Sequence, residues 1–296
     1  MALSPTFEPF VAPARSYPQI WRLVLGLVVI IAVYLLWMAG MGVALWLSAG
    51  AEGLEQRLVN IGRGGDPMSL LLLLLTFGGL ALGAVVAARA LHGRSAGSLF
   101  GRAPVVLRDF ALGLGILCGL ALMTGLPMLW MMELDPGVPL RLWLTFLPFV
   151  LLALLLQTGA EELVFRGYLQ QQLAARFASP VAWMVLPSVL FGLVHYAPAE
   201  MGANTWHVVL ATGVFGLVAA DLTARSGSIG LAWGLHFANN VFAILIVTAG
   251  GALDGMALTR LPYGPDDVEI MRPLIYADIA LILVAWALCR LALRAR

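Results

Sequence analysis

Residues 151–172 read LLALLLQTGAEELVFRGYLQQQ and join an apolar run to three charged side chains in one continuous helical pattern. A charged group at bilayer depth costs about 2.5–3.5 kcal/mol on insertion scales, so Glu161, Glu162 and Arg166 need compensation. Glu162 and Arg166 are expected to pair, because they are four residues apart on one helix face with the acid first. Glu161 points about 100° away and is left free for chemistry. A second reading stays open, in which these charges mark the helix end at the membrane surface.

The chain as a whole is strongly apolar. Hydrophobic residues make up 61% of its 296 residues and charged residues 11%, with a formal net charge of +1. This composition is typical of a polytopic helical membrane protein, and the net charge gives no indication of nucleic-acid binding. Cys118 and Cys289 both lie in apolar runs, which argues against a disulfide framework and against a Cys-type metal site.

Long apolar runs predict an all-α fold with eight transmembrane helices. The predicted spans are 20–47, 68–91, 109–132, 140–177, 180–198, 205–224, 229–249 and 273–292. Residues 1–19 carry four prolines and are expected to be a flexible cytoplasmic tail, whereas 20–296 form one membrane domain with its catalytic core at about 140–250. Residues 48–67 are expected to be a polar loop. Glycines at 113, 115 and 119 are expected to allow close helix approach.

The arginines indicate the orientation. They gather near the N-terminus, in 89–108, at Arg176 and Arg225, and at the C-terminus, and all of these fall on one side of an eight-helix protein. The loops on the other side lean acidic. The positive-inside rule therefore predicts that both termini are cytoplasmic. His92 lies in the basic loop and is expected to be solvated.

Polar side chains recur in the apolar second half of the chain. His195 ends the predicted fifth helix, and His236 lies one turn before Asn240 on the seventh. Together with Glu161 they come from three helices that can face one bundle interior. A carboxylate and an imidazole are the groups that activate a water, and a second histidine with an amide can donate hydrogen bonds to a developing oxyanion. This set predicts hydrolysis without a covalent nucleophile.

Other readings of these residues stay open. His195, His236 and Glu161 also form a donor set for a divalent metal such as zinc with one open water position. The metal-free reading is favoured, because Asn240 is a poor metal ligand and a good donor. Each polar residue alone also fits a structural hydrogen bond between helices.

Several further polar residues are expected to have structural roles, and one has no assigned role. Ser228 is expected to cap a helix rather than act as a nucleophile. Asp221 and Arg225 are expected to form an i,i+4 pair, and His207 to lie at the interface. Asp278 stands alone in the eighth helix and has no assigned role.

Three motifs together resemble a known family. They are Glu161-Glu162-x-x-x-Arg166, Phe191-x-x-x-His195 and His236-x-x-x-Asn240, in this order on successive apolar helices. This arrangement resembles the CAAX protease and bacteriocin-processing family, also called CPBP or Abi, which includes the type II CAAX prenyl endopeptidases. The resemblance covers residues 140–245. It implies that Glu161 and His195 activate the attacking water, that His236 and Asn240 stabilise the oxyanion, and that Glu162 and Arg166 support the site.

The function expected from this resemblance is that of an intramembrane endopeptidase in a bacterial plasma membrane. Its partners would be the lipid bilayer and a membrane-anchored or lipidated peptide, with no nucleic acid. The family is described both as metal-dependent and as a metal-free glutamate protease, so the expected cofactor is either none or a divalent metal. Two rivals remain, namely a non-catalytic adaptor or immunity protein of the same fold and a proton-coupled transporter. The transporter is disfavoured because the sequence shows no internal repeat.

Overall fold

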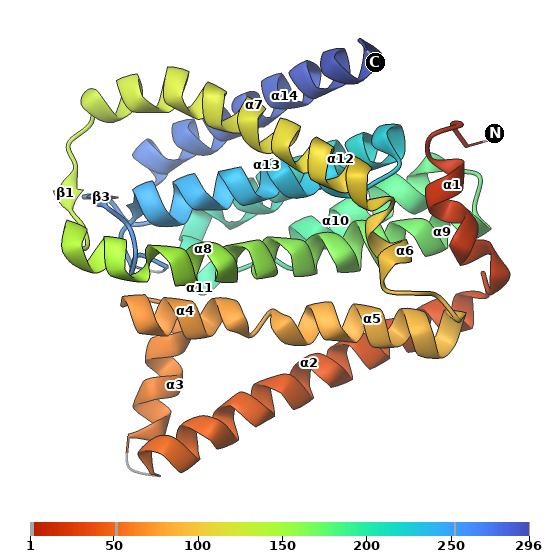
Figure 1. Ribbon diagram of the computed structural model, residues 1–296. Helices are drawn as coiled ribbons and strands as arrows, with labels where there is room; N and C mark the ends of the chain where they lie inside the picture. Colours follow the sequence, from red (N-terminus) through yellow and green to blue (C-terminus); the bar gives the residue numbers. More distant parts are fainter. Residues whose placement is uncertain (1–2, 51–52, 252, 296) are drawn as a thin grey trace.

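A computed structural model describes residues 3–50, 53–251 and 253–295, and it shows a bundle of long helices with both termini at one end (Figure 1). Six helices in this part of the chain are long and apolar enough to cross a membrane. They are Ile20–Ser48, Pro67–His92, Ala103–Gly125, Leu140–Arg176, Pro198–Ser226 and Val268–Arg294. Two shorter apolar helices, Val181–Leu193 and Gly230–Ile246, match the predicted fifth and seventh spans. The predicted all-α, polytopic membrane fold is confirmed.

Most of the helices follow one another with short connections, and residues 247–267 form a longer one before the last helix. The α-helices are α1 (Glu8–Val11), α2 (Ile20–Ala49), α3 (Leu54–Arg63), α4 (Pro67–Leu75), α5 (Gly78–His92), α6 (Gly97–Phe100), α7 (Ala103–Trp130), α8 (Leu140–Glu162), α9 (Gln171–Arg176), α10 (Leu186–Leu193), α11 (Pro198–Met201), α12 (Thr205–Ser226), α13 (Gly230–Val241) and α14 (Val268–Arg294). Stretches of π-helix cover Leu163–Gln170, Val181–Val185 and Phe242–Ile246, and 3₁₀ turns cover Ala12–Ser16 and Gly202–Asn204.

Three short strands, which the all-α prediction did not include, close one end of the bundle. They are β1 (Asp135–Pro136), β2 (Val247–Ala249) and β3 (Thr259–Leu261), in the order β1-β3-β2. β3 pairs antiparallel with β1 and parallel with β2. The sheet therefore ties the loop before α8 to the segment that follows α13.

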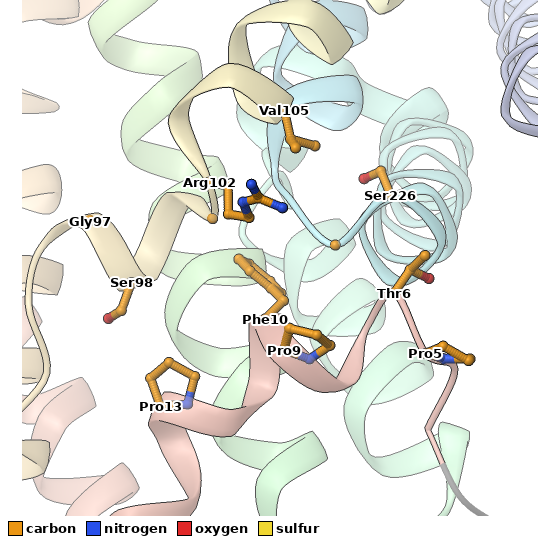
Figure 2. A pocket seen from close by; sticks show the side chains of 12 residues that line it. Pro5, Thr6, Pro9, Phe10, Pro13, Gly97, Ser98, Arg102, Val105 and Ser226 are labelled. Atoms are coloured by element: carbon orange, nitrogen blue, oxygen red, sulfur yellow. The ribbon is translucent and has the colours of Figure 1, made fainter. Parts of the chain in front are cut away.

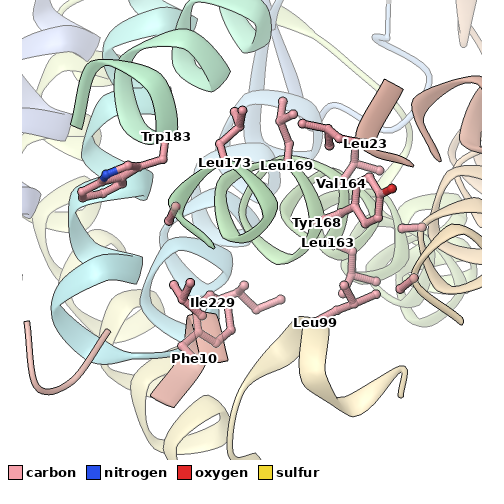
Figure 3. Close-up of a cluster of buried hydrophobic side chains, with 14 of the residues drawn as sticks. Phe10, Leu23, Leu99, Leu163, Val164, Tyr168, Leu169, Leu173, Trp183 and Ile229 are labelled. Atoms are coloured by element: carbon pink, nitrogen blue, oxygen red, sulfur yellow. The ribbon is translucent and has the colours of Figure 1, made fainter. Parts of the chain in front are cut away.

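The prediction of a flexible tail at residues 1–19 is wrong for residues 3–19, because these residues are folded onto the bundle. Phe7, Phe10 and Val11 are buried in the cluster shown in Figure 3, and the ring centroid of Phe7 lies 5.1 Å from that of Trp183. Ser4 Oγ donates to the carbonyl of Ala224 at 3.2 Å. The four prolines favour short turns, but the apolar side chains between them have a surface to bury.

This packing gives a stability prediction. Replacing Phe7 by Leu keeps an apolar side chain but removes the aromatic pair with Trp183, so we expect a loss of about 0.5–1.5 kcal/mol. The thermal unfolding midpoint of the purified protein in detergent measures it. Glu8→Gln is the control, because Glu8 pairs with Arg15 at the surface. An unchanged midpoint for Phe7→Leu would show that the segment does not contribute to the fold.

The basic loop is also less solvated than predicted. His92 is buried, and its Nε2 lies 2.8 Å from the hydroxyl of Tyr168, while Nδ1 lies 3.0 Å from the carbonyl of Tyr17. Arg94 is buried as well and donates to the carbonyl of Gly167 at 3.3 Å. Burial lowers the pKa of Arg94 to about 10. These contacts hold the loop against the helix that carries the candidate site.

The loop expected at 48–67 instead contains helix α3. Its apolar and polar residues lie on different faces, and it runs across the direction of α4 at the end of the bundle away from the termini (Figure 1). An amphipathic helix crossing the ends of membrane spans fits the membrane interface. The prediction of a loop at residues 48–67 was based only on polar composition, and it missed this amphipathic pattern.

Close packing of α13, which carries His236 and Asn240, against α7 depends on glycines. A Cβ at Gly113 would lie 2.6 Å from the carbonyl oxygen of Leu231, and one at Gly234 would lie 2.2 Å from that of Phe110. Glycine is therefore needed at both contacts. Gly115 and Gly119, which were expected to have the same role, have no such neighbour within 4 Å among the residues that the structure describes.

Candidate active site

The two adjacent glutamates lie where α8 passes into the π-helical stretch Leu163–Gln170. π-Helical turns are frequent at functional sites. Glu162 and Arg166 are buried, with 0% and 2% of their surfaces exposed, and Arg166 Nη1 donates to Glu162 Oε1 at 3.1 Å. The pair expected from the i,i+4 spacing is therefore present, and it lies inside the protein rather than at a helix end on the surface.

Arg166 also joins this helix to its neighbours. Its Nη2 donates to the carbonyl of Gly216 on α12 at 3.3 Å. Its guanidinium carbon lies 4.7 Å from the ring centroid of Phe191 on α10, a cation–π distance. One side chain thus compensates Glu162 and fixes α10 and α12 around it.

His236 lies between both glutamates. Its Nδ1 is 2.9 Å from Glu162 Oε1, and its Nε2 is 3.4 Å from Glu161 Oε2. The second contact is within ion-pair distance but lacks hydrogen-bond geometry, so Glu161 Oε2 has no hydrogen-bond partner among the described residues. Because an ionised carboxylate only accepts, the ring donates from Nδ1 in the hydrogen bond to Glu162.

The packing of α13 against α8 fixes the position of His236. Trp233 Nε1 donates to Thr158 Oγ1 at 3.1 Å. A Cβ at Gly159 would lie 2.9 Å from the Trp233 ring, so the glycine leaves room for the indole. One turn of α13 beyond this contact, His236 reaches the two glutamates.

His195 follows the short helix α10. At about 1.5 Å per residue, the apolar helix Val181–Leu193 spans about 20 Å and ends before it has crossed a bilayer. His195 Nδ1 lies 2.8 Å from the carbonyl of Phe191. A carbonyl only accepts, so Nδ1 carries the proton and, in the neutral ring, Nε2 has the free lone pair.

Asn240 makes a contact that the motif did not indicate. Its side-chain nitrogen donates to Gln157 Oε1 at 2.8 Å. Gln157 is buried and lies one turn before Glu161 on α8. A side-chain amide has two N–H donors, so Asn240 keeps one for another acceptor.

These side chains meet at a cavity of about 110 Å³, large enough for a few water molecules. Glu161, His195, His236 and Asn240 all line it, together with Gln157, Phe191, Ala211, Thr212, Phe215, Asn239, Asp278 and Ile282. Asn240 lies about 15 Å from the start of α13, and Asp278 about 15 Å from the start of α14. Since these starts lie at opposite ends of the bundle, the cavity lies near the middle of an apolar layer of about 30 Å.

Gln157 and Asp278 also line the cavity, although the three motifs did not include them. The sequence contains a signal for each of them. Gln157 shares a helix face with Glu161 at i,i+4, which is a usable signal. Asp278 is a carboxylate within an apolar span, which by itself suggests function. Its position beside the motif residues depends on how α14 packs.

The proposed metal donors do not gather into a metal centre. Within the described residues, no three His, Cys, Asp or Glu side chains are arranged to hold a metal ion. His236 directs both ring nitrogens toward glutamates rather than toward His195. His195, His236 and Glu161 share the cavity without converging on a common point, so the residues present do not fit the alternative metal site.

Other polar residues have structural contacts. Ser228 Oγ accepts from the backbone N–H of Gly230 at the start of α13, and Ser228 does not line the cavity. Asp221 and Arg225 form the expected pair at 2.8 Å. The His207 ring packs edge-on against Tyr276.

A larger cavity of about 410 Å³ lies elsewhere, near the N-terminal segment (Figure 2). Pro5, Pro9 and Pro13 line one side of it and Arg102 and Val105 the other. Among the described residues that line it, Arg102 is the one ionisable side chain, so they provide no acid–base pair. The smaller cavity is the better candidate for chemistry.

Comparison with known proteins shows which family the region around the cavity resembles. Residues 143–242 match the family described as type II CAAX prenyl endopeptidase Rce1-like. The chain is also 33% identical over 114 residues to the uncharacterized protein YyaK of Bacillus subtilis (strain 168), and this match covers 38% of each chain. No solved structure matches the chain. The family resemblance inferred from the three motifs is confirmed for the region that carries them.

Proposed function

We propose that this protein, whose residues 143–242 form an Rce1-like type II CAAX prenyl endopeptidase domain, is an intramembrane endopeptidase. The observation that carries the proposal is that Glu161, His195, His236 and Asn240 line one cavity from three elements of the bundle. The substrate is a peptide that is anchored in the membrane or lipidated, because the cavity lies at bilayer depth.

Glu161 is the general base in this proposal. Glu162 is committed to Arg166 and His236, whereas Glu161 Oε2 has no hydrogen-bond partner among the described residues. Glu161 takes one proton from the attacking water, and His195 orients that water by accepting its other hydrogen at Nε2. The water oxygen then forms a bond to the carbonyl carbon of the scissile peptide.

Asn240 and His236 act on the tetrahedral intermediate. The carbonyl oxygen becomes negative, and the free N–H of Asn240 donates to it, while Gln157 holds the amide in place. His236 supplies positive charge beside Glu161 when its ring is doubly protonated. Cleavage of the C–N bond then passes the proton held by Glu161 to the leaving amine, which leaves a carboxylic acid and an amine.

No step of this mechanism passes through a metal, because the donor residues do not converge. We expect purified protein to keep its activity after dialysis against a chelator. Activity measured beside the metal content of the same sample tests this. Stoichiometric zinc whose removal stops cleavage, and whose return restores it, would overturn the metal-free proposal.

Asn240→Ala is expected to lower kcat by about 10²–10³-fold, the usual cost of losing one oxyanion donor, with little change in folding. Gln157→Leu, which keeps Asn240 but removes its anchor, is expected to have a smaller effect of about tenfold. Steady-state cleavage of one anchored peptide by both variants measures this. A larger loss for Gln157→Leu than for Asn240→Ala would reassign the roles.

We propose that both termini face the cytoplasm of a bacterium, with the protein in its plasma membrane. The support is the arginine distribution together with the location of both termini at one end of the bundle. In a variant without Cys118 and Cys289, Asp266→Cys should react with an impermeant thiol reagent in intact cells. Ser95→Cys, at the other end, should not react. The reverse pattern would invert the orientation.

Activity itself is tested with purified protein in liposomes and a lipid-anchored quenched peptide library. Cleavage is expected for wild-type protein. A folded wild-type protein that binds anchored peptides and cuts none would favour the non-catalytic adaptor.

A further inference from the structure

Asp278 is an acidic side chain of the cavity that the mechanism above does not use. It belongs to α14, outside the residues that match the family. α14 runs beside α12 in the same direction (Figure 1). Arg272 Nε donates to Asn204 Oδ1 at 3.2 Å, and further along Trp286 Nε1 donates to Asp221 Oδ2 at 2.8 Å. These two contacts fix the helix on either side of Asp278 and hold that residue at the cavity.

Asp278 differs from the other two carboxylates in its surroundings. Glu162 has Arg166 and His236 as partners, and Glu161 faces His236 at 3.4 Å. Asp278 has no hydrogen bond or ion pair with any described residue. A lone carboxylate at this depth is costly, and nothing in the helix packing compensates it. Asp278 therefore lines the cavity with its carboxylate open to a partner on a bound peptide.

The charges around the cavity indicate what that partner is. Three carboxylates lie at or beside it, and among the described residues Arg166, which is paired with Glu162, is the one permanent positive charge there. A cationic group is the partner that best compensates an acid in a poorly solvated site, because it supplies both charge and N–H donors. Neutral N–H donors would leave the charge in place.

We propose that Asp278 forms a subsite that binds a lysine or arginine side chain of the anchored peptide, close to the scissile bond. This inference rests on the proposed endopeptidase function and adds to it a substrate class. Asp278 thereby acts as a specificity residue and takes no part in the bond-breaking steps.

The test uses anchored peptides that differ at one position, which carries either arginine or its neutral isostere citrulline, scanned along the sequence around the cleavage site. Wild-type protein in liposomes should cleave the arginine peptide with a kcat/KM about 10–100-fold higher at one position, mainly through KM. Asp278→Asn should remove this preference, so that the ratio of kcat/KM for the arginine and citrulline peptides falls to about 1. Glu269→Gln is the matched control, because it removes an exposed acid from the same helix and should keep the preference.

Several results of the same experiment would contradict the proposed subsite. Equal cleavage of both peptides at every position by wild-type protein would overturn the subsite, as would an equal loss on both peptides in Asp278→Asn. If wild-type protein cuts neither peptide, the proposed function fails, and binding then decides the subsite. In that case the arginine peptide should bind Glu161→Gln protein more tightly than the citrulline peptide, and the added Asp278→Asn change should abolish the difference. Equal binding of the two peptides would overturn it.

Discussion

Glu161→Gln is expected to reduce turnover by about 10⁴-fold, the upper end of the usual contribution of a general base. The amide has nearly the shape of the carboxylate but does not take a proton from water. The thermal midpoint should stay close to that of wild type, because Glu161 Oε2 makes no hydrogen bond to any described residue and Glu161 lines the cavity. Single-turnover cleavage of an anchored peptide, with the thermal midpoint of the same sample, measures both quantities.

The neighbouring residue supplies the comparison for this experiment. Glu162→Gln removes the same charge one position later, yet Glu162 is fully buried and bonded to Arg166 and His236. It should reduce the amount of folded protein first. If Glu161→Gln kept full activity while Glu162→Gln stayed folded and inactive, the two glutamates would exchange roles.

Arg166→Ala is expected to destabilise the protein by about 3–5 kcal/mol, the usual cost of leaving a buried charge without its partner. It also removes the contacts to Gly216 and to the Phe191 ring. The expected result is a large fall in the thermal midpoint and in the yield of monodisperse protein.

Asp221 and Arg225 provide a matched control with the same i,i+4 spacing. Their side chains keep 17% and 44% of their surfaces exposed, so Arg225→Ala should cost about 0–1 kcal/mol. The double variant Glu162→Gln with Arg166→Met should lose less than the sum of the single changes, because it leaves no unpaired charge. A fully additive double variant, or equal losses for Arg166→Ala and Arg225→Ala, would contradict the role of the buried pair.

The sequence predicted the parts of this protein that depend on local spacing. The Glu162–Arg166 contact follows from helical geometry, and the eight apolar runs correspond to six long and two shorter helices. The motifs on three helices also indicated side chains that do line one cavity. Their roles in the reaction remain predictions.

The parts that the sequence did not predict depend on tertiary packing. The N-terminal segment was expected to be flexible because of its prolines, yet Phe7 and Phe10 have a groove of the bundle to fill. His92 was expected in solvent, but Tyr168 of the site helix reaches it. Asp278 was left unassigned, because only the parallel packing of α14 on α12 brings it to the cavity. Each of these contacts joins residues far apart in the chain.

The most direct test of the central claim compares the protein ends present in membranes of cells that make wild-type protein or the Glu161→Gln variant at equal folded levels. We expect a set of new N-termini within or beside membrane segments that appear with wild-type protein and disappear with Glu161→Gln. The same set of termini in both membranes would contradict the claim that water activated at Glu161 cleaves membrane-anchored peptides.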